Sequence, residues 1–214
     1  MTITKYGHCC LLLEVAGKRI LTDPGRFSHD FDTLTDIDII LITHEHADHY
    51  HTESIARLLE LNPEAIVVTN TSVAKLLREL GVDAHILEGR EAATVVDITL
   101  EAYDGTHVEI FENFGLVQNT GYLVADTFFF PGDAYTVPDK HVHILGLPVA
   151  GPWCKVSDAI RYAIQIGPDI AIPVHDATLS ETGKEGTYSH FTRELTKHNT
   201  IFTPLAHGEA TLVP

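Results

Sequence analysis

The chain has 214 residues, of which 44% are hydrophobic and 21% are charged, a balance that excludes disordered and fibrous proteins. Its formal net charge is −16, from 30 acidic and 14 basic residues, so its field repels the phosphate backbone of a nucleic acid. The sequence contains no low-complexity linker and no fixed-period repeat, and its length suits one hydrophobic core. We therefore predict one domain over residues 1–214.

Cysteine usage and the N-terminal residues bear on the cellular compartment. Cys9 and Cys10 are adjacent, which is poor geometry for a mutual bridge, and Cys154 stands alone. The chain therefore has no disulfide framework, as is usual in a reducing cytoplasm. The first 15 residues contain only a three-leucine apolar run, too short for a signal-peptide core or a membrane span. We expect a cytoplasmic protein that does not enter a membrane.

Predicted strands and helices alternate in the first half of the chain. Apolar runs predict strands at residues 8–22 (two strands around a turn), 36–43 and 65–69. Leucines at helical spacing predict helices at residues 53–61 and 73–80. Thr52 is the expected N-cap of the first helix, and Thr71 or Ser72 that of the second, which ends at Gly81.

The second half begins with consecutive strands and then returns to alternation. Residues 93–103 read as one strand and residues 120–133 as a hairpin that turns near Ala125 and Asp126. Further strands are expected at residues 142–149, 169–176 and 209–213, and helices at 155–167, with Ser157 as its cap, and 187–199. Two sheets with helices on their outer faces give an α/β fold, a four-layer αββα sandwich.

Four histidines gather immediately after the strand at residues 36–43, in the stretch THEHADHYH. Side chains two residues apart in an extended chain project to the same side, so His44 and His46 can share one metal ion. The same pair in a helix would diverge by about 200°. Asp48 and His49 can reach this metal or a neighbour after a turn. These donors exceed what one loop supplies to a single zinc site, so the stretch indicates metal binding with further ligands elsewhere.

The candidate further ligands follow later predicted strands: His107, Asp133 and His175. Each has an ordinary explanation by itself, because a lone histidine is usually a surface or hydrogen-bonded residue and an aspartate after Pro-Gly is usual in a turn. Their shared position at strand ends that face the histidine-rich stretch makes them candidates together. Glu45 is expected to point away from the metal, and His51 to enter the following helix.

The series THEHADH, a later histidine, PGDA and PVHDA resembles the metallo-β-lactamase-fold hydrolases over essentially the whole chain. The N-terminal pattern YGHCCLLLE followed by ILTDPG is similar to their compact single-domain branch, which includes ascorbate-phosphate lactonase-like proteins and uncharacterised Zn-dependent hydrolases. The resemblance implies two metal sites that share one bridging carboxylate. It assigns His44, His46 and His107 to one metal, Asp48, His49 and His175 to the second, and Asp133 to both.

One departure from the family pattern leaves an alternative open. In several members of the compact branch the third histidine precedes a glycine, and this chain has Asp104 before Gly105. Asp104 is therefore the rival of His107 in the first site. His8 and Asp23 match positions that recur near the site, and a hydrogen-bonded structural role is expected for His8.

The implied activity is hydrolysis by a hydroxide that bridges two divalent ions, since metal binding lowers the pKa of water to about 7. The expected substrate is a small-molecule ester, lactone, thioester or phosphoester, and Asp48 would orient the hydroxide as a catalytic residue. Zinc suits the donors, and manganese, iron, cobalt and nickel remain alternatives. The rival functions are a nuclease or phosphodiesterase of the same fold, which the charge disfavours, and a metal-binding scaffold without activity.

Substrate contacts are sought in two stretches beyond the predicted ligands. Trp153 follows the predicted strand at residues 142–149, and it either reaches the mouth of the site or packs in the core. Residues 180–190 are polar and contain glycines, as expected of a loop over the site, so Tyr188 and His190 are the other candidates. β-Lactam hydrolysis does not follow from the family name, because function depends on the site and not on the fold.

Overall fold

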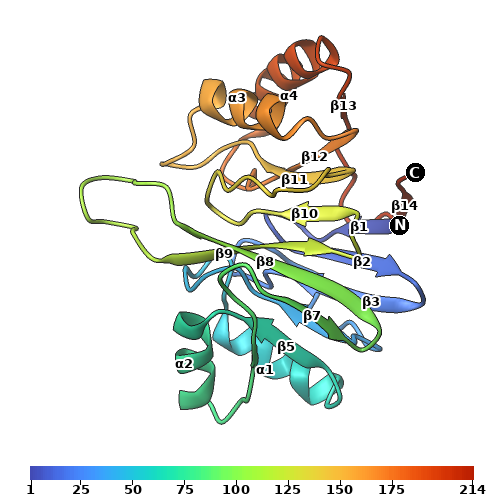
Figure 1. Cartoon of the computed structure of the whole chain (residues 1–214), viewed down its shortest axis with the longest axis vertical. Coiled ribbons are helices and arrows are strands. Elements are labelled where there is room, and N and C mark those ends of the chain that lie inside the picture. Colours follow the sequence, from blue (N-terminus) through green and yellow to red (C-terminus); the bar gives the residue numbers. More distant parts are fainter.

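Two mixed sheets of seven strands each lie face to face in the computed structural model, which describes residues 1–214 (Figure 1). The first sheet contains, in spatial order, β14 (Thr211–Leu212), β1 (Thr2–Lys5), β2 (Leu11–Val15), β3 (Lys18–Thr22), β4 (Ile39–Leu41), β5 (Ile66–Thr69) and β6 (His85–Ile86). The second contains β13 (Ile201–Phe202), β12 (Ile170–Val174), β11 (Ile144–Pro148), β10 (Phe128–Phe130), β9 (Gln118–Val124), β8 (Ile98–Thr106) and β7 (Ala92–Val95).

Helices cover the outer face of each sheet. The first sheet is covered by α1 (Thr52–Leu61) and α2 (Thr71–Glu79), and the second by α3 (Val156–Ile166) and α4 (Glu181–Thr196) (Figure 1). The predicted four-layer αββα sandwich is confirmed. None of the four helices combines the length and the apolar character that crossing a bilayer would require.

Strand alternation explains why the central strands read as continuous apolar runs. In β2, Leu11 and Leu13 face the core between the sheets, whereas Leu12 faces the helices. In β10, Phe130 faces the inter-sheet core and Phe129 faces the side of α3 and α4. A strand that is buried on both faces has no polar side to show, so each position is apolar.

One hairpin was predicted correctly and another was missed. The chain turns between β9 and β10 at Ala125 and Asp126, as expected, with φ of 50° and 52°. The predicted single strand at residues 93–103 is wrong, because β7 and β8 form a hairpin that turns at Val96 and Asp97. These two residues have φ of 42° and 69°, in the left-handed region that two-residue hairpin turns require. Such positions usually hold glycine, asparagine or aspartate. Because Val96 occupies the first of them, the sequence does not reveal the turn.

The helix starts differ from the predicted caps. The N-cap of α1 is His51, which makes no side-chain cap bond, rather than Thr52. Asn70 caps α2 by accepting from the amide of Val73, in place of Thr71 or Ser72. Lys155 takes the N-cap position of α3 that was expected of Ser157. The largest difference concerns residues 180–190, which belong to α4 and its cap and do not form a loop over the site.

A buried ion pair joins the two sheets beside the strand ends that matter below. Lys5 of β1 donates to Asp176, just after β12, at 2.6 Å, and to the carbonyl of Pro173 at 2.8 Å. The exposed fractions of the two charged side chains are 7% and 5%. Burial raises the pKa of Asp176, but the charge and hydrogen bond of Lys5 and the hydrogen bond from Tyr188 together outweigh it, so the pKa lies below its ordinary value. The pair therefore stabilises the fold at neutral pH.

Lys5→Met is expected to lower the free energy of unfolding by about 3 kcal/mol at pH 7, because it leaves the buried carboxylate of Asp176 without its cation. The loss should shrink as the pH falls below about 4, where the carboxylate is protonated in the unfolded chain and then in the folded chain. Urea unfolding at pH 7 and pH 3 measures both. Lys18→Met, which breaks the more exposed pair with Asp38, should cost less than about 1 kcal/mol. Equal losses for the two variants would contradict the argument.

Candidate metal centre

The seven predicted ligands lie together at one edge of the sandwich, each after the end of a strand. His44, His46, Asp48 and His49 follow β4, and the other three follow β8, β10 and β12. Six of the seven make ion-pair contacts with one another through Asp48 or Asp133, and His46 packs against its neighbours. The fold thus brings residues from four separate segments to one place.

The first group comprises three histidines. The ring centroids of His44 and His46 are 4.8 Å apart, and those of His46 and His107 are 4.5 Å apart. One nitrogen from each of the three rings lies within 4.8 Å of the others. Asp104 is exposed and accepts a hydrogen bond from Thr120 at 2.7 Å. Of the two rivals for the third position, the structure places His107 in this group and Asp104 outside it.

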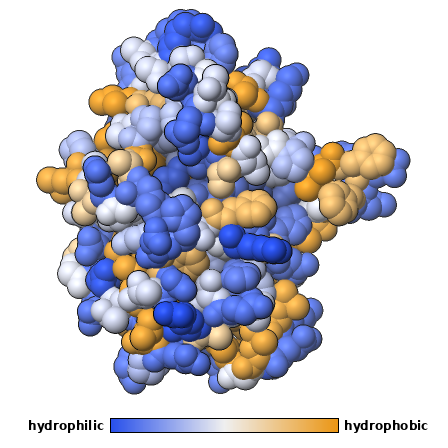
Figure 2. All heavy atoms as spheres, turned by 180° about the vertical axis from the view of Figure 1, so that it is seen from behind, coloured by the Kyte–Doolittle hydropathy of each residue, from blue (hydrophilic) through white to orange (hydrophobic).

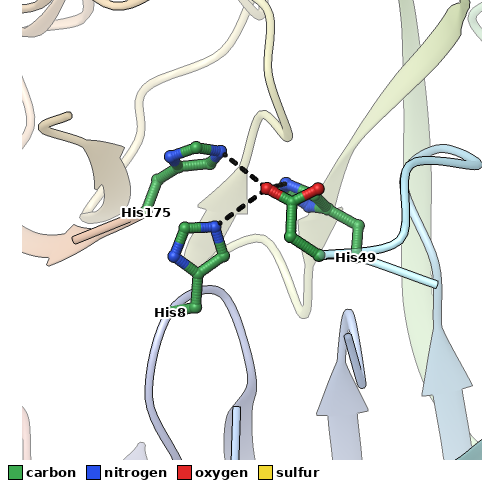
Figure 3. Close-up of side chains that lie close together, drawn as sticks. His8, His49 and His175 are labelled. Atoms are coloured by element: carbon green, nitrogen blue, oxygen red, sulfur yellow. Dashed lines mark hydrogen bonds and ion pairs between the residues drawn. The ribbon is translucent and has the colours of Figure 1, made fainter. Parts of the chain in front are cut away.

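The second group comprises Asp48, His49 and His175, and His8 lies against it. Figure 3 shows the rings of His8, His49 and His175 converging from different segments. The Nε2 atoms of His175 and His49 lie 3.4 Å and 3.8 Å from Oδ2 of Asp48. The donor atoms of the four residues lie within 4.8 Å of one another.

Asp133 lies between the two groups. Its Oδ2 is 3.2 Å from Nε2 of His107 in the first group and 2.9 Å from Nε2 of His175 in the second. Its Oδ1 is 3.2 Å from Nε2 of His49, and Nε2 of His44 lies 3.9 Å from Oδ2. A single carboxylate therefore faces donors of both groups, as a bridging ligand must.

The site has the chemistry of a metal centre, because several of its buried donor atoms have no hydrogen-bond partner. These atoms are Nε2 of His44 and His49, both ring nitrogens of His175, and Oδ1 of Asp133; the close contacts among them lack the geometry of a hydrogen bond. A buried polar atom without a partner costs about 1–3 kcal/mol, so five in one place call for a ligand. Imidazole nitrogen and carboxylate oxygen are donors that zinc and related divalent metals accept. The residues present fit divalent metal ions.

Hydrogen bonds to Nδ1 orient the rings of three of the histidines, His44, His49 and His107. Nδ1 of His49 lies 2.6 Å from Asp23, and Nδ1 of His107 lies 2.6 Å from the carbonyl of Val108. Thr43 donates to Asp23 at 2.7 Å, which leaves its oxygen to accept from Nδ1 of His44 at 3.0 Å. With Nδ1 engaged, each ring presents Nε2 to the centre of the site.

Burial and mutual charge set the protonation of the site. Desolvation, and then the charge of His49, lower the pKa of His44 well below its ordinary value. Burial alone would lower the pKa of His49, but the charges of Asp133 and Asp23 raise it well above. Burial likewise raises the pKa of Asp133, yet His175 and His49 bring it well below its ordinary value. Asp133 is therefore ionised at neutral pH, which is the form that binds a cation.

His8 is fully buried and contacts the second group through both its side chain and its backbone. Its Nδ1 accepts from the amide of Ala177 at 3.3 Å, so Nε2 carries the proton and donates to Asp48 at 3.2 Å. Its carbonyl accepts from the amide of His175 at 3.0 Å. Desolvation lowers the pKa of His8 to about 4, so the ring is neutral. This geometry agrees with the expected hydrogen-bonded role.

Comparison with known proteins decides the family. The family model described as "Beta-lactamase superfamily domain" matches residues 2–175. The chain belongs to the metallo-β-lactamase superfamily. Its relatives in this superfamily include Protein Rv0786c of Mycobacterium tuberculosis, 35% identical over 92% of this chain and 93% of the relative. A UPF0173 metal-dependent hydrolase of Alkaliphilus metalliredigens is 28% identical over 82% of this chain and 85% of the relative.

Solved structures agree with the metallo-β-lactamase fold. Igni18, a metallo hydrolase from Ignicoccus hospitalis, superposes with a TM-score of 0.74 and covers 98% of this chain and 97% of its own. At 16% identity this likeness shows the fold alone. The resemblance inferred from the four motifs is confirmed for the family.

The predicted substrate contacts of this superfamily member fall in three different places. Trp153 is 7% exposed and lines the cavity that contains Asp48 and Asp133. Tyr188 lines a neighbouring cavity, where its hydroxyl donates to Asp176. His190 is exposed on α4, beside Arg193. The structure thus brings only Trp153 to the candidate metal centre.

Proposed function

We propose that this chain is a binuclear metal-dependent hydrolase of small-molecule esters, lactones, thioesters or phosphoesters. The observation that carries the proposal is the place of Asp133, whose two oxygens face His107 of the first group and His49 and His175 of the second. The name of the relative from Alkaliphilus metalliredigens, a metal-dependent hydrolase, supports the same reading. Zinc is the proposed metal because imidazole and carboxylate donors suit it.

The chain's residues have distinct parts in such a reaction. Two divalent ions would supply a water that ionises near neutral pH and a Lewis acid for the substrate oxygen. His44, His46 and His107 would hold one ion, Asp48, His49 and His175 the other, and Asp133 both. Asp48 is 21% exposed at its side chain and lines the cavity, so its carboxylate can also accept a hydrogen bond from the attacking water and orient it.

Metal removal tests this proposal. Purified protein is expected to contain two divalent ions per chain by elemental analysis, and turnover should fall to background after chelation and return when zinc is restored. A panel of lactone, ester, thioester, phosphodiester, RNA and β-lactam substrates identifies the reacting group. Undiminished turnover by metal-free protein would contradict metal-dependent hydrolysis, and one ion per chain at full activity would contradict the binuclear centre. Preferential cleavage of RNA would replace the proposal by a nuclease.

A further inference from the structure

The cavity at the candidate metal centre has a polar floor and mostly apolar walls. Its volume is about 460 Å³, which suits a small organic molecule. The floor is formed by the predicted metal ligands. The walls are mostly apolar, and their apolar residues are Phe27, Ala47, Ile110, Phe114, Pro152 and Trp153. A substrate that fills this cavity must therefore place an apolar body against these walls.

Trp153 is the fixed part of the wall. Its ring meets the ring of His107 edge to face at 5.6 Å and that of His175 at 5.5 Å. It also packs against Tyr135, at 5.7 Å between centroids. Buried contacts on several sides hold the indole in one position, so it offers a rigid apolar surface directly beside the predicted ligands.

Another part of the wall comes from a projecting segment, residues 107–117, between β8 and β9 (Figure 1). Hydrophobic side chains gather at the end of the projection on the right of Figure 2. Phe111 and Phe114 of this segment are 68% and 69% exposed. Only Phe114 of the two lines the cavity, together with Ile110. An apolar ligand in the cavity would cover the ring of Phe114 and leave that of Phe111 in water.

Arg26 is the single lysine or arginine that lines this cavity. Most basic side chains of this acidic chain form ion pairs, but the guanidinium of Arg26 forms neither an ion pair nor a hydrogen bond. Its backbone is fixed, because its amide donates to the carbonyl of Ala47 at 2.8 Å, next to Asp48. An exposed, unpaired guanidinium therefore lines the cavity on a backbone that is fixed beside Asp48, and its planar donors match a carboxylate or phosphate.

We propose that the substrate is an amphipathic anion, with its apolar body between Trp153 and Phe114 and its anionic group on Arg26. This inference rests on the proposed function for the bond that is cleaved at the metal centre. It adds the substrate class: an ester or related compound that carries a carboxylate or phosphate away from the scissile bond. Arg26 selects this class against neutral esters of the same length.

Matched esters test the part played by the charge. The zinc-loaded protein is assayed with p-nitrophenyl hexanoate and with the p-nitrophenyl monoester of adipic acid, which has a free carboxylate at the far end. Arg26→Gln is expected to lower kcat/KM for the adipate ester about tenfold and to change that for the hexanoate ester less than twofold. Arg78→Gln is the control, because Arg78 is also unpaired but lies on α2 outside the cavity. Equal losses on both esters, or none, would overturn the role of Arg26.

The aromatic wall is tested by a matched pair in the same segment. Phe114→Ala should raise KM for both esters severalfold, whereas Phe111→Ala should leave both unchanged. The reverse pattern would overturn the proposed position of the apolar body.

Equilibrium binding separates this inference from the proposed function. Calorimetry with 4-phenylbutyrate, 3-phenylpropyl phosphate and the neutral 4-phenylbutyramide needs no turnover. Both anions should bind the zinc-loaded protein more tightly than the amide, and Arg26→Gln should remove most of that difference; the better anion identifies the substrate's charged group. Turnover of esters with no discrimination by charge contradicts only the inference. Discrimination in binding without any hydrolysis contradicts only the proposed function.

Discussion

Asp133→Asn is expected to bind fewer than two metal ions per chain and to lose turnover by a factor on the order of 10³. The substitution keeps the size of the side chain and removes its negative charge. The carboxylate is 2% exposed and lies within 4 Å of four imidazole rings, those of His44, His49, His107 and His175. An amide is neutral, and it has one oxygen that can bind a metal where the carboxylate has two. It therefore cannot replace the carboxylate as a ligand shared by the two groups.

Elemental analysis and turnover on the best substrate of the panel are measured on the same preparations. The matched control is Asp104→Asn, which changes the rival ligand, an exposed aspartate that contacts Thr120. That variant should keep both metals and most of its turnover. Two metals and full turnover in Asp133→Asn would refute the bridging role, and metal loss in Asp104→Asn would reopen the choice between Asp104 and His107.

The sandwich was predictable because its strands are buried on both faces. Runs such as Ile39–Leu41 and Phe128–Phe130 are apolar at each position, and the intervening leucine stripes have helical spacing. The errors come from elements without such periodicity. β6 and β13 have two residues each, and the turn at Val96 and Asp97 contains neither glycine nor asparagine. Their conformations depend on contacts with distant strands, which a local pattern does not contain.

The start of α4 was mispredicted for a related reason. Gly183 and Gly186 favour a loop by their intrinsic propensity. In the structure, Ser180 caps the helix by accepting from the amide of Gly183, and Phe191 and Leu195 are buried further along. The helix therefore starts at a serine cap that is visible in the sequence, in spite of two glycines in its first two turns.

In the candidate site, too, some residues could be predicted from the sequence and others required the structure. The seven predicted ligands could be found in the sequence because each follows a predicted strand. Residues just after a strand lie outside the hydrogen-bonded sheet, so their side chains can turn toward a shared site. The choice between Asp104 and His107 required the structure, since it depends on where β8 ends and which side chain then turns inward. Arg26 carried no signal of its own. Its position follows from the close approach of the preceding residue, Gly25, to the backbone of Asp48 and His49, which are distant in the sequence.

Gly25→Ala is expected to lower the free energy of unfolding by about 3 kcal/mol and to weaken metal binding at the second group. A Cβ at this position would lie 1.8 Å from the carbonyl oxygen of Asp48 and 2.4 Å from the amide nitrogen of His49. Both atoms belong to the backbone, so no side-chain rotation relieves the clash. Either the segment that carries Arg26 moves away, or the loop that holds Asp48 and His49 shifts from its position beside Asp133.

Gly186→Ala separates this effect from the general effect of replacing a glycine. Gly186 is exposed within α4 and has open space around the position of a Cβ, so its replacement should raise the free energy of unfolding by about 0.5–1 kcal/mol. Urea unfolding and metal content per chain are compared for the two variants and the parent. A Gly25→Ala protein with the parental midpoint and two tightly bound metals would show that the loops tolerate separation. The opposite result would mean that the close approach of Gly25 to the backbone of Asp48 and His49 keeps the second group of ligands in position, because a displacement at Gly25 moves the loop that carries them.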